Sequence, residues 1–143
     1  MNKNILIIGA GGQIPQVLIP LLQEQPGLHL TLFGRHTAKL PYTNVTKVSG
    51  DAGKLTDLIN VMKNQDIIYM NFDNKKVTEI VIDAMHKTGV KRIIQAGVLS
   101  VYGEVAEPFA TWNSHMMGEA VAHNRGVEAL EVSDLDYTYM RMT

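Results

Sequence analysis

The sequence predicts an α/β fold in which a doubly wound parallel sheet carries helices on both faces. Short apolar runs alternate along the chain with amphipathic stretches of helix length, and this alternation is typical of repeated strand–helix–strand units. The apolar runs are nearly continuous, which indicates strands that are buried on both faces. The chain has 143 residues, of which 45% are hydrophobic and 19% charged. This length and composition suit a single globular domain over residues 1–143.

The predicted strands are apolar runs that stop at glycine or at polar residues. The first run, NILIIGA, is rich in isoleucine and leads into a glycine-rich turn, as expected of a buried strand. The second, LHLTLF, alternates in polarity, which also favours a strand. We expect six strands, over residues 4–10, 28–33, 45–48, 66–72, 90–97 and 135–141.

The predicted helices lie between these strands and carry apolar residues three or four positions apart. Pro15 falls in the first turn of the first helix, where its missing N–H costs nothing, whereas Pro20 lies deeper and should kink the helix. Gly89 follows the third helix and should end it as a left-handed cap. We expect four helices, over residues 13–25, 51–63, 74–87 and 110–124.

Composition argues against several classes of function. A formal net charge of −1 provides no field that would favour a nucleic acid or an anionic membrane as partner,. The lack of cysteine excludes disulfides and thiolate metal ligands and fits a cytoplasmic location,. His115 and His123 are too isolated to predict a metal site. No apolar run approaches the roughly 20 residues that span a bilayer, and the first run is too short for a secretory signal.

Binding residues should gather at one edge of the predicted sheet. Ligands of doubly wound parallel sheets bind at the carboxyl ends of the strands, at the point where the strand order reverses. Five segments follow predicted strands and would meet at that edge. They are residues 9–13, 34–36, 50–51, 71–73 and 97–100.

The first of these segments is a glycine-rich loop between a strand and a helix. Gly9, Gly11 and Gly12 would let the backbone approach a pyrophosphate closely, and the helix that follows would offer free N–H groups and the positive end of its dipole. A turn with a structural role alone is the alternative, because many strand-to-helix turns use glycine. The place of the loop after the first strand favours a dinucleotide site.

The residues after the second strand favour NADP(H) over NAD(H). An NAD site commonly carries an acidic residue there, which holds the ribose 2′-hydroxyl. Residues 28–40 contain no acidic residue and instead include Arg35, His36 and Lys39. A guanidinium suits a 2′-phosphate. The alternative is that these cations are solvated loop residues.

Asp51, after the third strand, has two compatible interpretations. Its carboxylate would accept a hydrogen bond from the adenine amino group, or it would act as the N-cap of the next helix. The sequence does not favour one over the other.

Several segments together resemble an atypical short-chain dehydrogenase/reductase, and the nearest group is the NmrA-like NAD(P)-binding proteins. They are GAGGQI, LFGR, GDAGKLTDLI, DIIYMNF, KRIIQAGVLSVYG and LDYTYMR. The resemblance covers essentially the whole chain and implies a Rossmann fold with strand order 3-2-1-4-5-6. Pro15 stands where the family pattern has its third glycine.

The resemblance also implies which residues hold the cofactor. They are Gly9, Gly11, Gly12, Gln13 and Ile14 at the pyrophosphate, Gly34 beside Arg35 and His36 at the 2′-phosphate, Asp51 and Ala52 at the adenine, Asn71, Phe72 and Asp73 at the nicotinamide ribose, and Ala96, Gly97 and Val98 at the nicotinamide.

The catalytic residues of the family do not all have counterparts. Its enzymes use a serine or threonine after the fifth strand and then a Tyr-x-x-x-Lys pair, whose tyrosine is the acid/base. These positions fall on Val98, Thr111 and His115, and no Tyr-x-x-x-Lys occurs in the chain. His115 is therefore the candidate catalytic residue, as a ribose anchor or proton relay, with a surface histidine as the alternative. A shifted alignment would bring in Ser100 or Tyr102.

Three functions are compatible with these observations. The first is an NADP(H)-dependent oxidoreductase acting on a small-molecule acceptor such as a flavin or quinone, by family resemblance. The second is a non-catalytic NADP(H)-binding regulator or redox sensor with a protein partner. The third, a relative of the nucleotide-sugar epimerases and dehydratases, needs the tyrosine that is missing. We expect a short or missing C-terminal substrate-binding part, and the sequence allows an oligomer.

Overall fold

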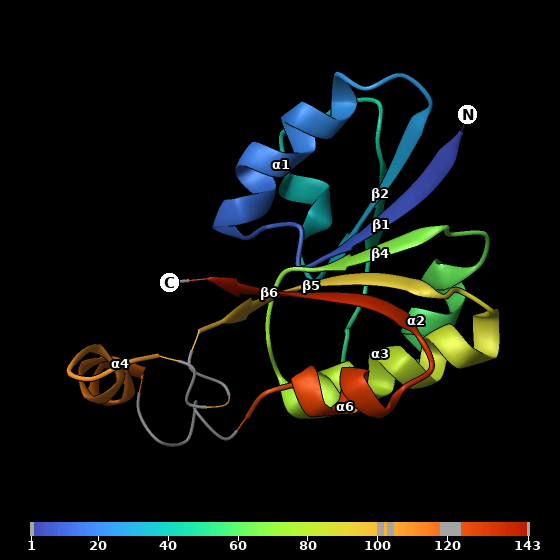
Figure 1. The fold of residues 1–143 in the computed structure, drawn as a ribbon. Helices are drawn as coiled ribbons and strands as arrows, with labels where there is room; N and C mark the ends of the chain where they lie inside the picture. The colour runs from blue at the N-terminus through green and yellow to red at the C-terminus, as the bar shows by residue number, and fades with distance from the viewer. Residues whose placement is uncertain (1, 100–101, 103–104, 118–123, 143) are drawn as a thin grey trace.

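The computed structural model describes residues 2–99, 102, 105–117 and 124–142 (Figure 1). Their strands form one six-stranded sheet of order β3-β2-β1-β4-β5-β6 in which all neighbouring strands are parallel. This confirms the predicted fold class and strand order. The strands are β1 (Lys3–Ile8), β2 (Leu28–Gly34), β3 (Thr46–Ser49), β4 (Ile67–Met70), β5 (Arg92–Val98) and β6 (Asp136–Met142).

Helices cover both faces of the sheet. One face carries the N-terminal helix and a short 3-10 turn, and the opposite face carries three helices (Figure 1). The first face has α1 (Gln13–Gln23) and η1 (Thr37–Lys39), and the second has α2 (Leu55–Met62), α3 (Lys75–Thr88) and α6 (Val127–Val132). A further helix, α4 (Phe109–Met117), lies to the side of the sheet (Figure 1).

Two apolar cores lie between the sheet and these helices. Along β1, Ile5 and Ile7 pack into the core under α1, whereas Leu6 and Ile8 pack into the core beneath α2 and α3. Successive side chains of a strand point to opposite faces, so a strand covered on both faces must be apolar at every position. This explains the continuous apolar run from which the first strand was predicted.

Capping residues end or begin the helices near the predicted places. The Asn74 side chain accepts a hydrogen bond from the Val77 N–H at 3.0 Å and caps the start of α3,. Gly89 ends α3 with a φ of 79° in the left-handed region, as predicted,. Helix α1 starts directly after Gly12, with Pro15 buried in its first turn. The proline therefore does not prevent a helix from following the glycine loop.

Asp51 is not the N-cap of α2, so that interpretation is wrong. Helix α2 begins at Leu55, and Asp51 lies in the preceding turn. The Asp51 carboxylate accepts from the Gly53 N–H at 2.8 Å, and its carbonyl accepts from the Lys54 N–H at 3.0 Å. A local aspartate turn therefore competes with capping at this position.

Of the helix predicted over residues 110–124, the structure confirms the first part, as α4. Helix α4 ends at Met117, residues 118–123 lie outside the described residues, and Asn124 is not helical. Helix α6 was not predicted. It is only six residues long, which is too short for a helical period to stand out in the sequence.

Candidate functional site

A pocket of about 480 Å³ lies at the carboxyl ends of the first four strands. It is lined by residues that follow β1, β2, β3 and β4 and by the first turns of α3. Among the residues predicted to hold a cofactor, those that line this pocket are Gly9, Gly34, Arg35, Asp51, Ala52 and Phe72. The predicted edge of the sheet therefore contains a real cavity, and it lies where the strand order reverses,.

The glycine loop is packed closely against the end of β4. Gly9 has a φ of +80°, and a Cβ built there would lie 3.1 Å from the Phe72 ring. A Cβ at Gly12 would overlap the side-chain amide of Asn71, whereas a Cβ at Gly11 would meet only one atom, 4.0 Å away. The backbone conformation favours glycine at Gly9, and a side chain at Gly12 would have to displace the Asn71 amide, so the loop also has a structural role,. This is compatible with a cofactor role, because Gly9 of the loop lines the pocket and α1 begins directly after Gly12,.

Two cationic side chains line the pocket, and they come from segments far apart in the sequence. Arg35 follows β2, and Lys76, which was not predicted, lies in the first turn of α3. Both are exposed. His36, which was predicted beside Arg35, is not among the pocket-lining residues. The pocket therefore offers two positive charges against the one carboxylate of Asp51, a balance that suits a ligand rich in anionic oxygens.

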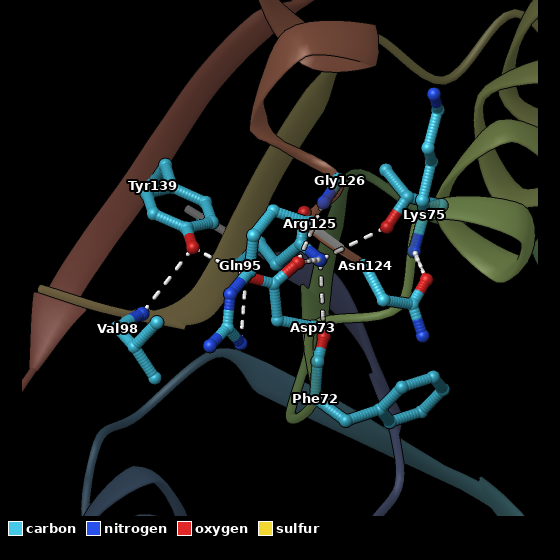
Figure 2. Close-up of polar contacts among 10 residues, drawn as sticks. Phe72, Asp73, Lys75, Gln95, Val98, Asn124, Arg125, Gly126 and Tyr139 are labelled. Carbon is cyan, nitrogen blue, oxygen red and sulfur yellow. Dashed lines mark hydrogen bonds and ion pairs between the residues drawn. The ribbon is translucent and has the colours of Figure 1, made fainter. Parts of the chain in front are cut away.

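A nearly buried polar cluster lies beside the pocket and brings together the segment after β4, the middle of β5 and β6, and the residues before α6 (Figure 2). We call it the Asp73 cluster, and its members are Asp73, Gln95, Arg125, Gly126 and Tyr139. The Asp73 side chain, 5% exposed, accepts from the Gly126 N–H at 2.7 Å and the Gln95 amide at 3.4 Å. It also accepts from the Tyr139 hydroxyl and pairs with the Arg125 guanidinium at 3.7 Å. Asp73 was predicted at the nicotinamide ribose, but its carboxylate is turned into this cluster.

Tyr139 connects this cluster to the end of β5. Its ring passes over Gly97, where a Cβ would overlap the ring, and its hydroxyl accepts from the Val98 N–H at 3.2 Å. Burial, followed by the hydrogen bond to Asp73, raises the pKa of Tyr139. The phenol therefore stays neutral near pH 7 and does not have the properties of a general base.

The residues aligned with the catalytic positions are not brought to the pocket. The Thr111 hydroxyl donates to Glu107 at 2.7 Å, and His115 is exposed on α4, to the side of the sheet (Figure 1). The Tyr102 hydroxyl donates to Glu131 at 2.8 Å, and this bond, together with desolvation and the negative charges of Glu131 and Glu128, raises the pKa of Tyr102 to about 12. Ser100 lies outside the described residues.

Sequence reasoning missed four residues at this edge. Gln95 had a signal, since it is a polar residue within an apolar strand, and it is fully buried with its amide bonded to Phe72 and Thr78 at 3.0 Å. Lys76, Arg125 and Tyr139 had none, because their roles depend on contacts between distant parts of the chain.

Neither a metal cluster nor a membrane span is found in the described part of the chain. Over those residues, no three His, Cys, Asp or Glu side chains lie close enough together to hold a metal ion. In the same residues, no helix combines the length and the apolar character that crossing a bilayer requires.

Comparison with known proteins adds a family and several relatives. The profile of a family described as NAD(P)H-binding matches residues 9–143. A Rossmann-fold NAD(P)-binding family protein from Shigella flexneri is 35% identical, with a TM-score of 0.75 over 99% of this chain and 67% of that chain. Protein YmjC of Escherichia coli strain K12 is 43% identical over 54 residues, which make up 36% of this chain and 88% of YmjC.

A third similarity concerns the fold. A short-chain dehydrogenase/reductase from Veillonella parvula DSM 2008, solved in complex with NADP, is 24% identical. Its TM-score is 0.93, and the match covers 100% of this chain and 70% of that chain. At this identity the similarity shows the shared fold.

Proposed function

Because the chain belongs to the NAD(P)H-binding family, we propose that it is an atypical short-chain dehydrogenase/reductase that binds NADP(H) and reduces a small-molecule acceptor. The observation that carries this proposal is the pocket at the ends of β1 to β4. The pocket brings together residues from four separate segments that were predicted from the sequence to contact the cofactor.

The residues of this edge fit a dinucleotide. The adenosine half would occupy the pocket, with Arg35 and Lys76 as partners for a 2′-phosphate,. The pyrophosphate would lie at the glycine loop, where Gly11 leaves room and the first turn of α1 offers free N–H groups,. The nicotinamide half would then extend past the switch point between β1 and β4 towards Val98,.

In this proposal, the residues of the chain bind and orient the cofactor, and none of those described above supplies the proton that accompanies hydride transfer. When bound, NADPH supplies a hydride to the acceptor. Tyr139 does not deliver the accompanying proton, because its hydroxyl donates to Asp73 and its pKa is raised by burial and by that bond. Quinones and flavins place the least demand on a protein acid, since water can protonate their reduced forms. We therefore propose acceptors of this class.

The cofactor preference is tested by titrating NADPH and NADH into the protein and into two variants. Arg35→Ala should lower NADPH affinity by about ten- to a hundredfold, the range of a charge-assisted hydrogen bond, and should leave NADH affinity within about twofold. Lys39→Ala is the matched control, because Lys39 is a nearby exposed cation that does not line the pocket. Equal affinity of the wild type for both cofactors would contradict the preference.

A non-catalytic NADP(H)-binding regulator is the second candidate. One observation favours it: the chain lacks a Tyr-x-x-x-Lys pair. NADPH oxidation should be followed with a panel of quinones and flavins, and with His115→Ala as a further variant. Tight NADPH binding without turnover of any acceptor would favour the regulator.

A further inference from the structure

Tyr139 reaches across β5 from the strand beside it. In the register of β5 and β6, Tyr139 lies opposite Gln95, and its ring passes over Gly97. Its hydroxyl lies within 3.2 Å of the Val98 nitrogen and donates to Asp73, the third residue after β4 (Figure 2). One side chain of β6 thus holds together the ends of β4 and β5.

The Val98 N–H needs a partner that the sheet does not supply. In a parallel strand, successive N–H groups point to alternate neighbours. The Leu99 N–H bonds to Met142 on β6, so the Val98 N–H points towards β4. The pairing of β4 with β5 ends at Met70 and Gln95, and the Tyr139 hydroxyl takes the place of the missing strand.

The hydroxyl is held in one orientation. Because it donates to Asp73, it can only accept from Val98. Asp73 is fixed in turn by the Gly126 N–H at 2.7 Å and by the Arg125 guanidinium at 3.7 Å (Figure 2). The position of the Val98 backbone therefore depends on a partly buried chain of hydrogen bonds from Val98 through Tyr139 to Asp73,.

We propose that Tyr139 is a positioning residue for the nicotinamide half of the cofactor and acts through the backbone of Val98. The inference rests on the proposed NADP(H) binding. The pocket for the adenosine half is lined from β1 to β4 and from α3, whereas Tyr139 and Val98 lie on β6 and β5. Loss of the hydroxyl should therefore affect one half of the cofactor site and spare the other.

The test compares two ligands and two tyrosines. NADPH, followed by its nicotinamide fluorescence, reports on the whole site, and 2′,5′-ADP reports on the adenosine half alone. Tyr139→Phe should weaken NADPH binding by about five- to tenfold, the value of one or two hydrogen bonds, and leave 2′,5′-ADP binding within about twofold. Tyr137→Phe is the matched control, because Tyr137 packs into the same core from the same strand and should leave both affinities within about twofold.

The outcomes separate this inference from the proposed function. If the wild type binds neither ligand, the proposed function is wrong and the inference falls with it. If the wild type binds both, and Tyr139→Phe shows the same ratio of the two affinities as Tyr137→Phe, the inference alone is wrong. A parallel loss of both affinities indicates a merely structural role and also overturns it.

A second variant decides the question if Tyr139→Phe does not fold. Asp73→Asn keeps the size of the side chain, but it leaves one oxygen for the donors that now share two and removes the charge that orients the Tyr139 hydroxyl. It should lower NADPH affinity by about threefold or more, with 2′,5′-ADP binding within about twofold. An unchanged ratio of the two affinities in Asp73→Asn, relative to Tyr137→Phe, would overturn the inference.

Discussion

The ring of Tyr139 occupies the space that a side chain at Gly97 would need. Gly97 lies on β5, where it pairs in register with Arg141 of β6. Tyr139 precedes Arg141 by two positions on the same strand. The glycine lets the ring cross the strand, and the crossing brings the hydroxyl to Val98 and Asp73. The sequence interpretation placed Gly97 against the nicotinamide, but its close neighbour in the described structure is this ring.

Gly97→Ala should therefore destabilise the fold, and the effect should depend on Tyr139. We expect a loss of about 2–3 kcal/mol in the free energy of unfolding, because overpacking forces the ring off its position. In a Tyr139→Ala background the same substitution should cost less than about 1 kcal/mol, because the obstructing ring is gone. Urea unfolding of the four proteins measures this double-mutant cycle. Equal costs in the two backgrounds would show that the two residues are not coupled.

Two neighbouring glycines of the loop provide a matched pair of substitutions, because a Cβ would meet very different surroundings at the two positions. Gly12→Ala should cost about 1–3 kcal/mol of stability, because its Cβ would overlap the Asn71 amide,. Gly11→Ala should change stability by no more than about 0.5 kcal/mol, since a Cβ there meets only one atom of Leu40 at 4.0 Å,. Thermal or urea unfolding measures both, and equal effects would contradict the packing seen at Asn71.

Much of the fold could be predicted because the information is local. The run Ile5–Ile8 is apolar at every position because successive side chains pack alternately into the two cores. Asn74 and Gly89 carry the chemistry that begins and ends α3,. The edge of the sheet that holds the pocket follows from the alternation of strands and helices alone.

The rest depends on contacts between distant segments. Asp73 and Tyr139 lie 66 positions apart, and neither residue type indicates the other. Arg125 reaches Asp73 because Gly126, whose Cβ would overlap Thr78, lets its segment approach α3. Asp51 shows that local information can also mislead, because the predicted helix cap is replaced by a turn at Gly53 that was not predicted.

Two neighbouring lysines test which side of α3 faces the cofactor. Lys76 lines the pocket, whereas Lys75 lines a groove between α3 and α6. Lys76→Gln should weaken 2′,5′-ADP binding by about three- to tenfold, because one cation facing the phosphates is lost. Lys75→Gln should leave it within about twofold. Isothermal titration calorimetry at two salt concentrations measures the affinities, and a larger effect at Lys75 would place the ligand on the wrong side of the helix.

Alkaline pH should weaken the fold through Tyr139. Burial and the hydrogen bond to Asp73 raise the pKa of Tyr139 above the ordinary value of 10.0. A raised folded-state pKa contributes stability that is complete below the unfolded pKa and is lost as pH rises beyond it. The stability difference between wild type and Tyr139→Phe should therefore be constant from about pH 7 to 9 and narrow above about pH 10. Tyr69 and Tyr102, whose pKa values are also raised, are present in both proteins and cancel in the difference. Urea unfolding at stepped pH measures it, and a difference that stays constant up to about pH 11 would mean that the Tyr139 hydroxyl is not held by Asp73 in solution.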